Sequence, residues 1–208
     1  SEPSLSEVFL TAAHDGEFMH QTDDELKAKG LVKPTGGLCA STCGANIMHA
    51  MYLYLKQDNF RDQSDTVAEI VRYAYVFNQQ DATHGLILRT LGDALEAVAA
   101  RIGDFHLSTK ITNGMDLNVF NLVPAVDSLN IIAVSSGSRA HAMIVVKVDT
   151  IDKTVILVDP NFPNPPRTAR YREFWDGDGF DSIELYFNRY STEHVNILQQ
   201  LRVTLEKP

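Results

Sequence analysis

A run of small residues around the two cysteines constrains the fold of this chain more than any other stretch. A Gly-Gly pair at 36–37 forms a loop, Cys39 follows it, and every residue from 40 to 45, Cys43 included, is small. Apolar residues then recur at helical spacing, so the sequence predicts a helix over about 40–56. Because small side chains let packing partners approach closely, we expect this helix to lie wedged between two lobes.

The character of the chain changes near its middle. Its first half carries further helical patterns, predicted at Glu7–Ala13, Thr66–Asn78 with Asp65 or Ser64 as cap, Leu86–Ile102, and Leu117–Leu129 as a short helix broken before Pro124. Its second half carries β-branched and aromatic runs, predicted as strands at Ile131–Val134, Ala142–Val148, Thr154–Val158 and Ile183–Phe187. Helices followed by strands are typical of an α+β fold with two lobes, and we expect the seam between residues 115 and 130. The segment 195–205 fits either a last strand or a last helix.

Length and charge limit the classes of function. The 208 residues suffice for one domain with a substantial core. The net charge of −9 argues against nucleic acid or an acidic membrane surface as partner, because phosphate binding needs clustered Lys and Arg. No apolar run reaches membrane-spanning length, so we expect no membrane insertion. Two cysteines four positions apart make neither a disulfide framework nor a zinc site, and we expect no metal and no cofactor.

Either cysteine is a candidate nucleophile. A thiol at the start of a helix faces unpaired backbone N–H groups and the positive end of the helix dipole, and both favour the thiolate. Cys43 has Thr42 before it as a possible N-cap and Gly44 after it, but it also falls within the apolar stripe of the helix. Cys39 is followed by the small residues of the run. We therefore prefer Cys39 as nucleophile and Cys43 as a core thiol, with two buried, unreactive thiols as the alternative.

Partners for the thiol lie about a hundred residues further along the chain. His141 opens an apolar strand, Asp159 closes the following strand, and Asp152-Lys153 between them predicts a hairpin turn. Since the two residues are 18 positions apart with the turn near the middle, the hairpin brings them side by side, where the carboxylate can orient the imidazole. Asn161 is a second orienting candidate. The structural alternatives are a strand-edge polar residue for His141 and a turn residue before Pro160 for Asp159.

The other polar and aromatic side chains show no ligand spacing. Six histidines are interpreted as surface or structural residues: His14, His20, His49, His84, His106 and His194. The loop with Trp175, Asp176 and Asp178 is interpreted as structural or as the rim of a cleft, with calcium binding as a minor alternative. The Pro-rich stretch 161–166 is expected to be a stiff loop near the site.

Three motifs, in this order, resemble the papain-like cysteine peptidases. A Cys opens a small-residue helix at Cys39, a His heads an apolar strand at 141–146, and Asp-Pro-Asn ends the next strand at 159–161. The nearest branch is that of the bacteriocin-leader-processing (double-glycine) peptidases, and the resemblance covers about two-thirds of the chain. It implies a single papain-like domain, with a helical lobe at 1–125 and an antiparallel β lobe at 126–208. It also implies a Cys39, His141 and Asp159 triad that hydrolyses a peptide or protein substrate.

The sequence departs from this family just before the nucleophile. Papain-like sites carry a Gln there, whose amide helps to bind the oxyanion, and residues 33–37 contain none. We expect backbone N–H groups at the helix start, and the Thr35 hydroxyl, to replace it. The missing Gln motivates a second hypothesis, a non-catalytic binding module on the same scaffold. A transglutaminase-like acyl transferase or deamidase would use the same triad. Because the chain opens at Ser1 without a Met, an export signal removed from an exported bacterial protein is one expectation.

Overall fold

The fold is taken from a computed structural model. It describes residues 2–34, 36–57, 61–136, 139–171, 174–175, 179–180, 183–188 and 191–206, with the side chains of 136, 139 and 172–194 outside the description. The helices in these ranges are α1 Leu5–His14, α2 Asp24–Ala28, α3 Cys39–Tyr54, α4 Gln63–Asn78, α5 Leu88–Val98 and α6 Val119–Leu122. Short helical turns occur at η1 Ala82–His84, η2 Ala99–Gly103 and η3 Gly114–Asp116. The strands are β1 His106–Asn113, β2 Ser128–Ser136, β3 Arg139–Asp149, β4 Thr154–Asp159, β5 Phe162–Tyr171, β6 Phe174–Trp175, β7 Gly179–Phe180, β8 Ile183–Asn188 and β9 Ser191–Glu206. This content confirms the α+β class.

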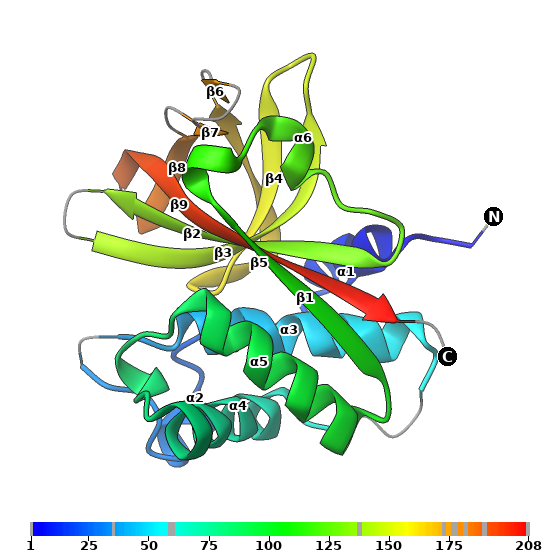
Figure 1. Ribbon diagram of the computed structural model, residues 1–208, viewed down its shortest axis with the longest axis vertical. Helices are drawn as coiled ribbons and strands as arrows, with labels where there is room; N and C mark the ends of the chain where they lie inside the picture. Colours follow the sequence, from blue (N-terminus) through cyan, green and yellow to red (C-terminus); the bar gives the residue numbers. More distant parts are fainter. Residues whose placement is uncertain are drawn as a thin grey trace.

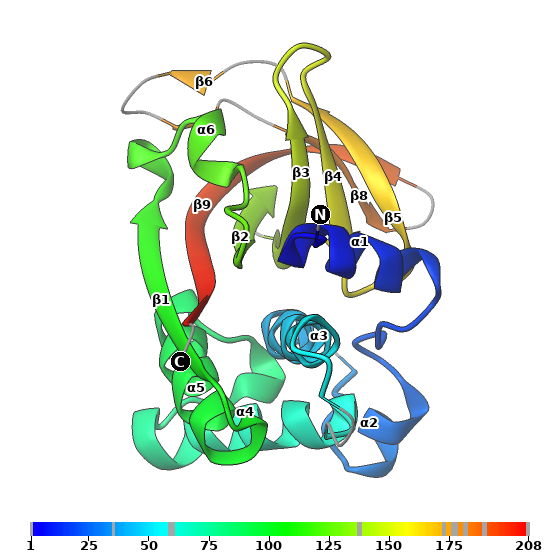
Figure 2. The same ribbon diagram turned by 90° about the vertical axis from the view of Figure 1, so that its right-hand side faces the viewer.

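Seven of these strands form one antiparallel sheet that closes on itself through β9. The order is β1-β9-β2-β3-β4-β5-β8, and β9 also pairs with β8. The first part of β9 pairs with β8, and its later part runs between β2 and β1. Figure 2 shows β9 (red) curving from β8 across to β1. The segment 195–205, which the sequence left open between helix and strand, is therefore the strand that joins the two ends of the sheet.

The helix α3 lies between the sheet and the helices α4 and α5 (Figures 1 and 2). It packs against β3 on one side and against α4 and α5 on the other, and its residues from 40 to 52 are all buried. A Cβ added at Gly44 would lie 2.9 Å from the Leu95 side chain and 3.2 Å from those of Ile70 and Leu91. The small residues are thus needed for this close approach, and the expected wedged position of the helix is confirmed.

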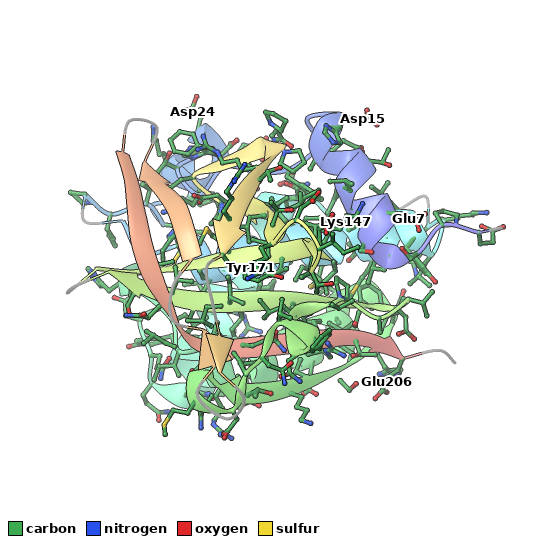
Figure 3. The ribbon with its side chains drawn as sticks, turned by 90° about the horizontal axis from the view of Figure 1, so that it is seen from above. Glu7, Asp15, Asp24, Lys147, Tyr171 and Glu206 are labelled. Carbon is green, nitrogen blue, oxygen red and sulfur yellow. The ribbon has the colours of Figure 1, made fainter. Side chains whose placement is uncertain are left out.

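A second apolar cluster fills the concave side of the curled sheet. Its strand residues point away from α3 and include Ile132, Met143, Val145, Leu157 and Tyr171. Leu117, which directly follows η3, and Val119 and Leu122 of α6, which lies over the sheet, pack into the same cluster. In Figure 3, which looks down on the sheet, Tyr171 lies among the strands, whereas Glu7 and Asp15 mark α1 near the edge.

Several local predictions need correction. The cap of α4 is Asp62, whose carboxylate accepts a hydrogen bond from the Ser64 N–H at 2.7 Å, and not Ser64 or Asp65. The third helix ends at Val98 and continues only as a π-helical turn over 99–103. The short helix covers only four residues, Val119–Leu122; it ends before Pro124, as predicted, but it does not resume, and β2 begins at Ser128. The strand β1 was not predicted and lies before the expected seam. Its buried and exposed residues alternate only weakly, so the sequence shows no clear two-residue period there.

The Pro-rich stretch 161–166 forms the start of β5 instead of a loop. Pairing between β4 and β5 joins Leu157 to Arg167 and Asp159 to Phe162, and the register shifts between these two pairs. Proline has no N–H to donate to a ladder. The prolines therefore lie where the β4–β5 register is interrupted, and the segment remains extended beside the end of β4.

Candidate active site

Cys39 is the first residue of α3 and is half-buried. The residue before it, Leu38, makes no side-chain cap, and its carbonyl accepts the first helical hydrogen bond from the Thr42 N–H at 2.9 Å. The N–H groups ahead of Thr42 therefore have no partner within the helix. These donors and the positive end of the helix dipole surround the thiol.

His141 and Asp159 meet as the hairpin geometry predicts. His141 lies near the start of β3, and Asp159 is the last residue of β4. The imidazole Nε2 and the carboxylate Oδ1 are 2.6 Å apart, and both side chains are buried. The same Oδ1 accepts a hydrogen bond from the Asn161 N–H at 2.9 Å. Asn161 therefore helps to fix the carboxylate through its main chain.

The thiol of Cys39 and the imidazole of His141 are hydrogen-bonded, which joins the three residues into one chain. Burial raises the pKa of Cys39, but the hydrogen bond and charge of His141, with N–H donors at Ala142 and Ala40, outweigh it and lower the pKa below its usual value. Burial lowers the pKa of His141, but its hydrogen bonds and charge interactions with Asp159 and Cys39 outweigh it and raise the pKa to about 10. The arrangement therefore favours a thiolate beside an imidazolium.

Cys43 lies one helical turn further along α3, and its surroundings differ from those of Cys39. It is fully buried, and its thiol donates to the Ala142 carbonyl at 3.6 Å. Burial, followed by the negative charges of Cys39 and Asp159, raises its pKa well above the usual value. Since the thiolate is the nucleophilic form, Cys43 is the poorer candidate. The geometry thus agrees with the preference for Cys39, whose catalytic role stays a prediction.

A cleft of about 680 Å³ opens over the thiol and the imidazole. Its walls come from the 21–22 segment, the loop before α3, the η1–α5 connection, the ends of β2 and β3, and the turn after β4. The lining residues are Gln21, Thr22, Lys33, Pro34, Gly36, Gly37, Cys39, Ala40, His84, Gly85, Leu86, Leu88, Ala133, Ala140, His141, Ala142 and Asn161. Small residues make up much of this lining, so main-chain atoms of the protein are accessible from the cleft.

Gln21 lines this cleft with Cys39 and His141, and sequence reasoning missed it. The search covered residues 33–37, whereas Gln21 lies 18 positions before Cys39, with α2 and a loop between them. Its side chain is buried, and its Oε1 has no hydrogen-bond partner in the described part of the protein. A polar atom buried in this way is unusual. A search that allowed a helical insertion between the Gln and the Cys would have found it.

The remaining candidates have mixed outcomes. The interpretation as surface or structural residues is confirmed for His14 and His106, which are exposed, for His20, whose Nδ1 accepts from the Thr22 N–H, and for His49, which is buried with its Nε2 3.8 Å from Glu17. His84 is exposed and also lines the cleft, and the side chain of His194 lies outside the described residues. Thr35 and the loop carboxylates Asp176 and Asp178 lie outside the described residues. Within the described ranges, His, Cys, Asp and Glu nowhere gather into a group of three able to hold a metal ion.

Comparison with known proteins gives no assignment. The sequence matches no model of a protein family, and no curated protein matches it. A search of the helices in the described ranges finds none with the length and apolar character needed to cross a bilayer.

Proposed function

We propose that this chain is a papain-like cysteine peptidase, or a related thiol amide hydrolase. The observation that supports it is the continuous hydrogen-bonded chain from Cys39 through His141 to Asp159 beneath an open cleft. This arrangement supplies a nucleophile, a group that moves a proton, and a carboxylate that orients that group. The bacteriocin-leader-processing branch is the relative that the motifs favour.

The proposed reaction has two steps. The Cys39 thiolate forms a bond to the carbonyl carbon of an amide, and the carbonyl electron pair moves to oxygen. As the tetrahedral intermediate collapses, the His141 imidazolium gives its proton to the amide nitrogen, and the C–N bond breaks to release an amine. Water then loses a proton to His141 and attacks the thioester, and the C–S bond breaks to release an acid and restore the thiolate–imidazolium pair.

The oxyanion of both steps needs hydrogen-bond donors. The free N–H groups at the start of α3 supply one set, and the side-chain amide of Gln21, which lines the same cleft, supplies another. Loss of one such donor typically costs about 10²–10³ in rate. The proposed role of Gln21 removes the reason for the binding-only hypothesis, which the absence of Gln from 33–37 had motivated.

The lining of the cleft favours a peptide main chain as the substrate. Gly36, Gly37 and Gly85 lie on one side of it, and Ala133 and Ala140 on another. With few bulky side chains between, the backbone of a peptide can approach the protein backbone and form hydrogen bonds with it. We expect small residues beside the scissile bond. Water and an amine would enter the same site, so acyl transfer is a variant of this function that differs only in the acceptor.

The test is turnover of fluorescence-quenched peptides with Gly or Ala around the scissile bond. We expect Cys39→Ala and His141→Ala to abolish cleavage and Cys43→Ala to retain it. Mass spectrometry of the products, with and without a primary amine, separates hydrolysis from acyl transfer. Iodoacetamide should modify Cys39 much faster than it modifies free cysteine at neutral pH. A cleavage rate in wild type equal to that of Cys39→Ala would contradict the proposal.

A further inference from the structure

The segment 17–22 carries Gln21 into the cleft without belonging to any helix or strand. It connects α1 to α2, and its residues Phe18 and Met19 are buried. Buried N–H and C=O groups need partners, which a strand would find in its neighbours. Here the partners of the two consecutive residues are the side chains of two asparagines.

Each asparagine satisfies both main-chain groups of one residue. Asn46 accepts from the Met19 N–H at 3.1 Å and donates to the Met19 carbonyl at 3.1 Å. Asn164 accepts from the Phe18 N–H at 3.2 Å and donates to the Phe18 carbonyl at 2.7 Å. An Asn amide can do this because it carries a donor and an acceptor side by side. The pair is called the Asn clamp below.

The clamp connects the segment both to the helix that carries Cys39 and to the strand that follows Asp159. Asn46 belongs to α3, the helix that begins at Cys39, and Asn164 belongs to β5, which follows Asp159. Two residues beyond the clamp, the Gln21 N–H donates to the Pro160 carbonyl at 2.8 Å. The main chain of Gln21 is thereby fixed relative to the helix that carries the thiol and to the strand that carries the carboxylate.

We infer that Asn46 and Asn164 are positioning residues, which act on catalysis by holding Gln21 where its amide meets the oxyanion. The inference rests on the proposed function, because it needs an oxyanion to bind. A displacement of about 1 Å in a positioned group can cost about 10²-fold in rate. The segment has no strand ladder of its own, and at Phe18 and Met19 its main chain is held by the two Asn side chains, so the loss of either Asn is transmitted to Gln21.

The test is a double-mutant cycle between Asn164→Ala and Gln21→Ala. Asn164 is chosen because it is only half-buried, whereas Asn46 is 1% exposed. We expect Gln21→Ala to lower kcat about 10²–10³-fold and Asn164→Ala to lower it about 10–100-fold, with KM within a few-fold of wild type. In the Gln21→Ala background, Asn164→Ala should lower kcat no further.

Two further variants separate positioning from general destabilisation. Asn164→Asp keeps the acceptor for Phe18 but loses the donor, and should lower kcat by an intermediate factor; it also serves if the alanine variant fails to fold. Asn130→Ala is the matched control, because Asn130 is a buried Asn that donates to the Leu122 carbonyl at 2.8 Å and does not line the cleft. It should lower the melting temperature and leave kcat unchanged. The rate of iodoacetamide modification of Cys39 should stay constant across the series, since alkylation needs no oxyanion donor.

The outcomes distinguish failure of the Asn clamp from failure of the proposed peptidase function. Equal factors for Asn164→Ala with and without Gln21 would overturn the clamp while leaving the peptidase proposal intact. An unchanged kcat in Asn164→Ala, or an equal loss in Asn130→Ala, would do the same. If wild-type turnover does not depend on Cys39, the proposed function and the clamp's role fall together.

Discussion

Replacement of Asp159 by Asn should narrow the range of pH over which the proposed peptidase activity is observed. The carboxylate is 1% exposed, and its Oδ1 lies 2.6 Å from the imidazole of His141. An Asn has nearly the same shape and can still accept hydrogen bonds, but it carries no charge. The substitution therefore tests the charge of the partner of His141 and little else.

The expected size follows from the hydrogen bond that loses its charge. A hydrogen bond to a charged group is worth about 1.5–3 kcal/mol, and one pKa unit corresponds to about 1.4 kcal/mol. The pKa of His141, which burial lowers and Asp159 and Cys39 raise to about 10, should therefore fall by about 1–2 units in Asp159→Asn. The imidazolium is the form that protonates the leaving amine. Since deprotonation of His141 removes this donor, activity falls as the pH rises through its pKa, and in the variant this fall should begin at about pH 8–9.

The assay is kcat/KM for a peptide substrate between pH 5 and 11, beside the rate of iodoacetamide modification. Alkylation needs only the thiolate, so it should stay high where turnover has fallen. Asp149→Asn is the matched control, because Asp149 lies at the other end of the same hairpin and accepts from two N–H groups of its turn. If kcat/KM falls at the same alkaline pH in Asp159→Asn as in wild type, the reasoning is refuted. A parallel loss of alkylation would mean that alkaline unfolding sets the limb instead.

Three further predictions concern the small-residue run and the cleft. Cys43→Ala should keep rapid iodoacetamide modification and Cys39→Ala should lose it, with labelled peptides identified by mass spectrometry. Gly37→Ala should disturb the cleft wall and lower both stability and kcat/KM, because its Cβ would overlap the carbonyl of Thr83 in η1. Gly36→Ala is the comparison: its Cβ would meet open space, and its φ of +77° should cost about 1 kcal/mol of unfolding free energy only. Gly44→Ala should lower the unfolding free energy by about 1–3 kcal/mol in urea titrations, since its Cβ would crowd α5; an unchanged midpoint would contradict the wedged packing.

Sequence reasoning located the parts of the site whose geometry is local. His141 and Asp159 belong to one hairpin, and the turn between them fixes their relation, so their contact followed from spacing alone. The start of α3 was equally clear because small residues and helical spacing point to the same element. Gln21 is not placed by such local spacing, because α2 and a loop separate it from Cys39. The contacts of its segment with Asn46 and Asn164 join residues that are distant in sequence and carry no recognisable pattern.

The rest of the fold depends on pairing between strands that are far apart in sequence, which local patterns do not predict. The residues of β1 alternate weakly, and the ends of the chain show no signal that β9 pairs with β1, β2 and β8. The prolines at the start of β5 give that stretch the sequence pattern of a loop, and a strand tolerates them there because the β4–β5 ladder is interrupted. In each case the tertiary partner, and not the local propensity, decides the structure.

The closure of the sheet by β9 has a consequence for how the protein is made. The only sheet partner of β1 in the described structure is β9, which is about 90 residues further along the chain. One neighbour of β2 and one neighbour of β8 are also supplied by β9. During synthesis, every residue of the candidate triad is therefore made before β9, the strand that completes the scaffold. The thiol and the imidazole of a nascent chain are made early, but the rigid frame between them is complete only after residues 191–206 have been made and β9 has paired. The candidate site is therefore expected to take its final geometry late in folding.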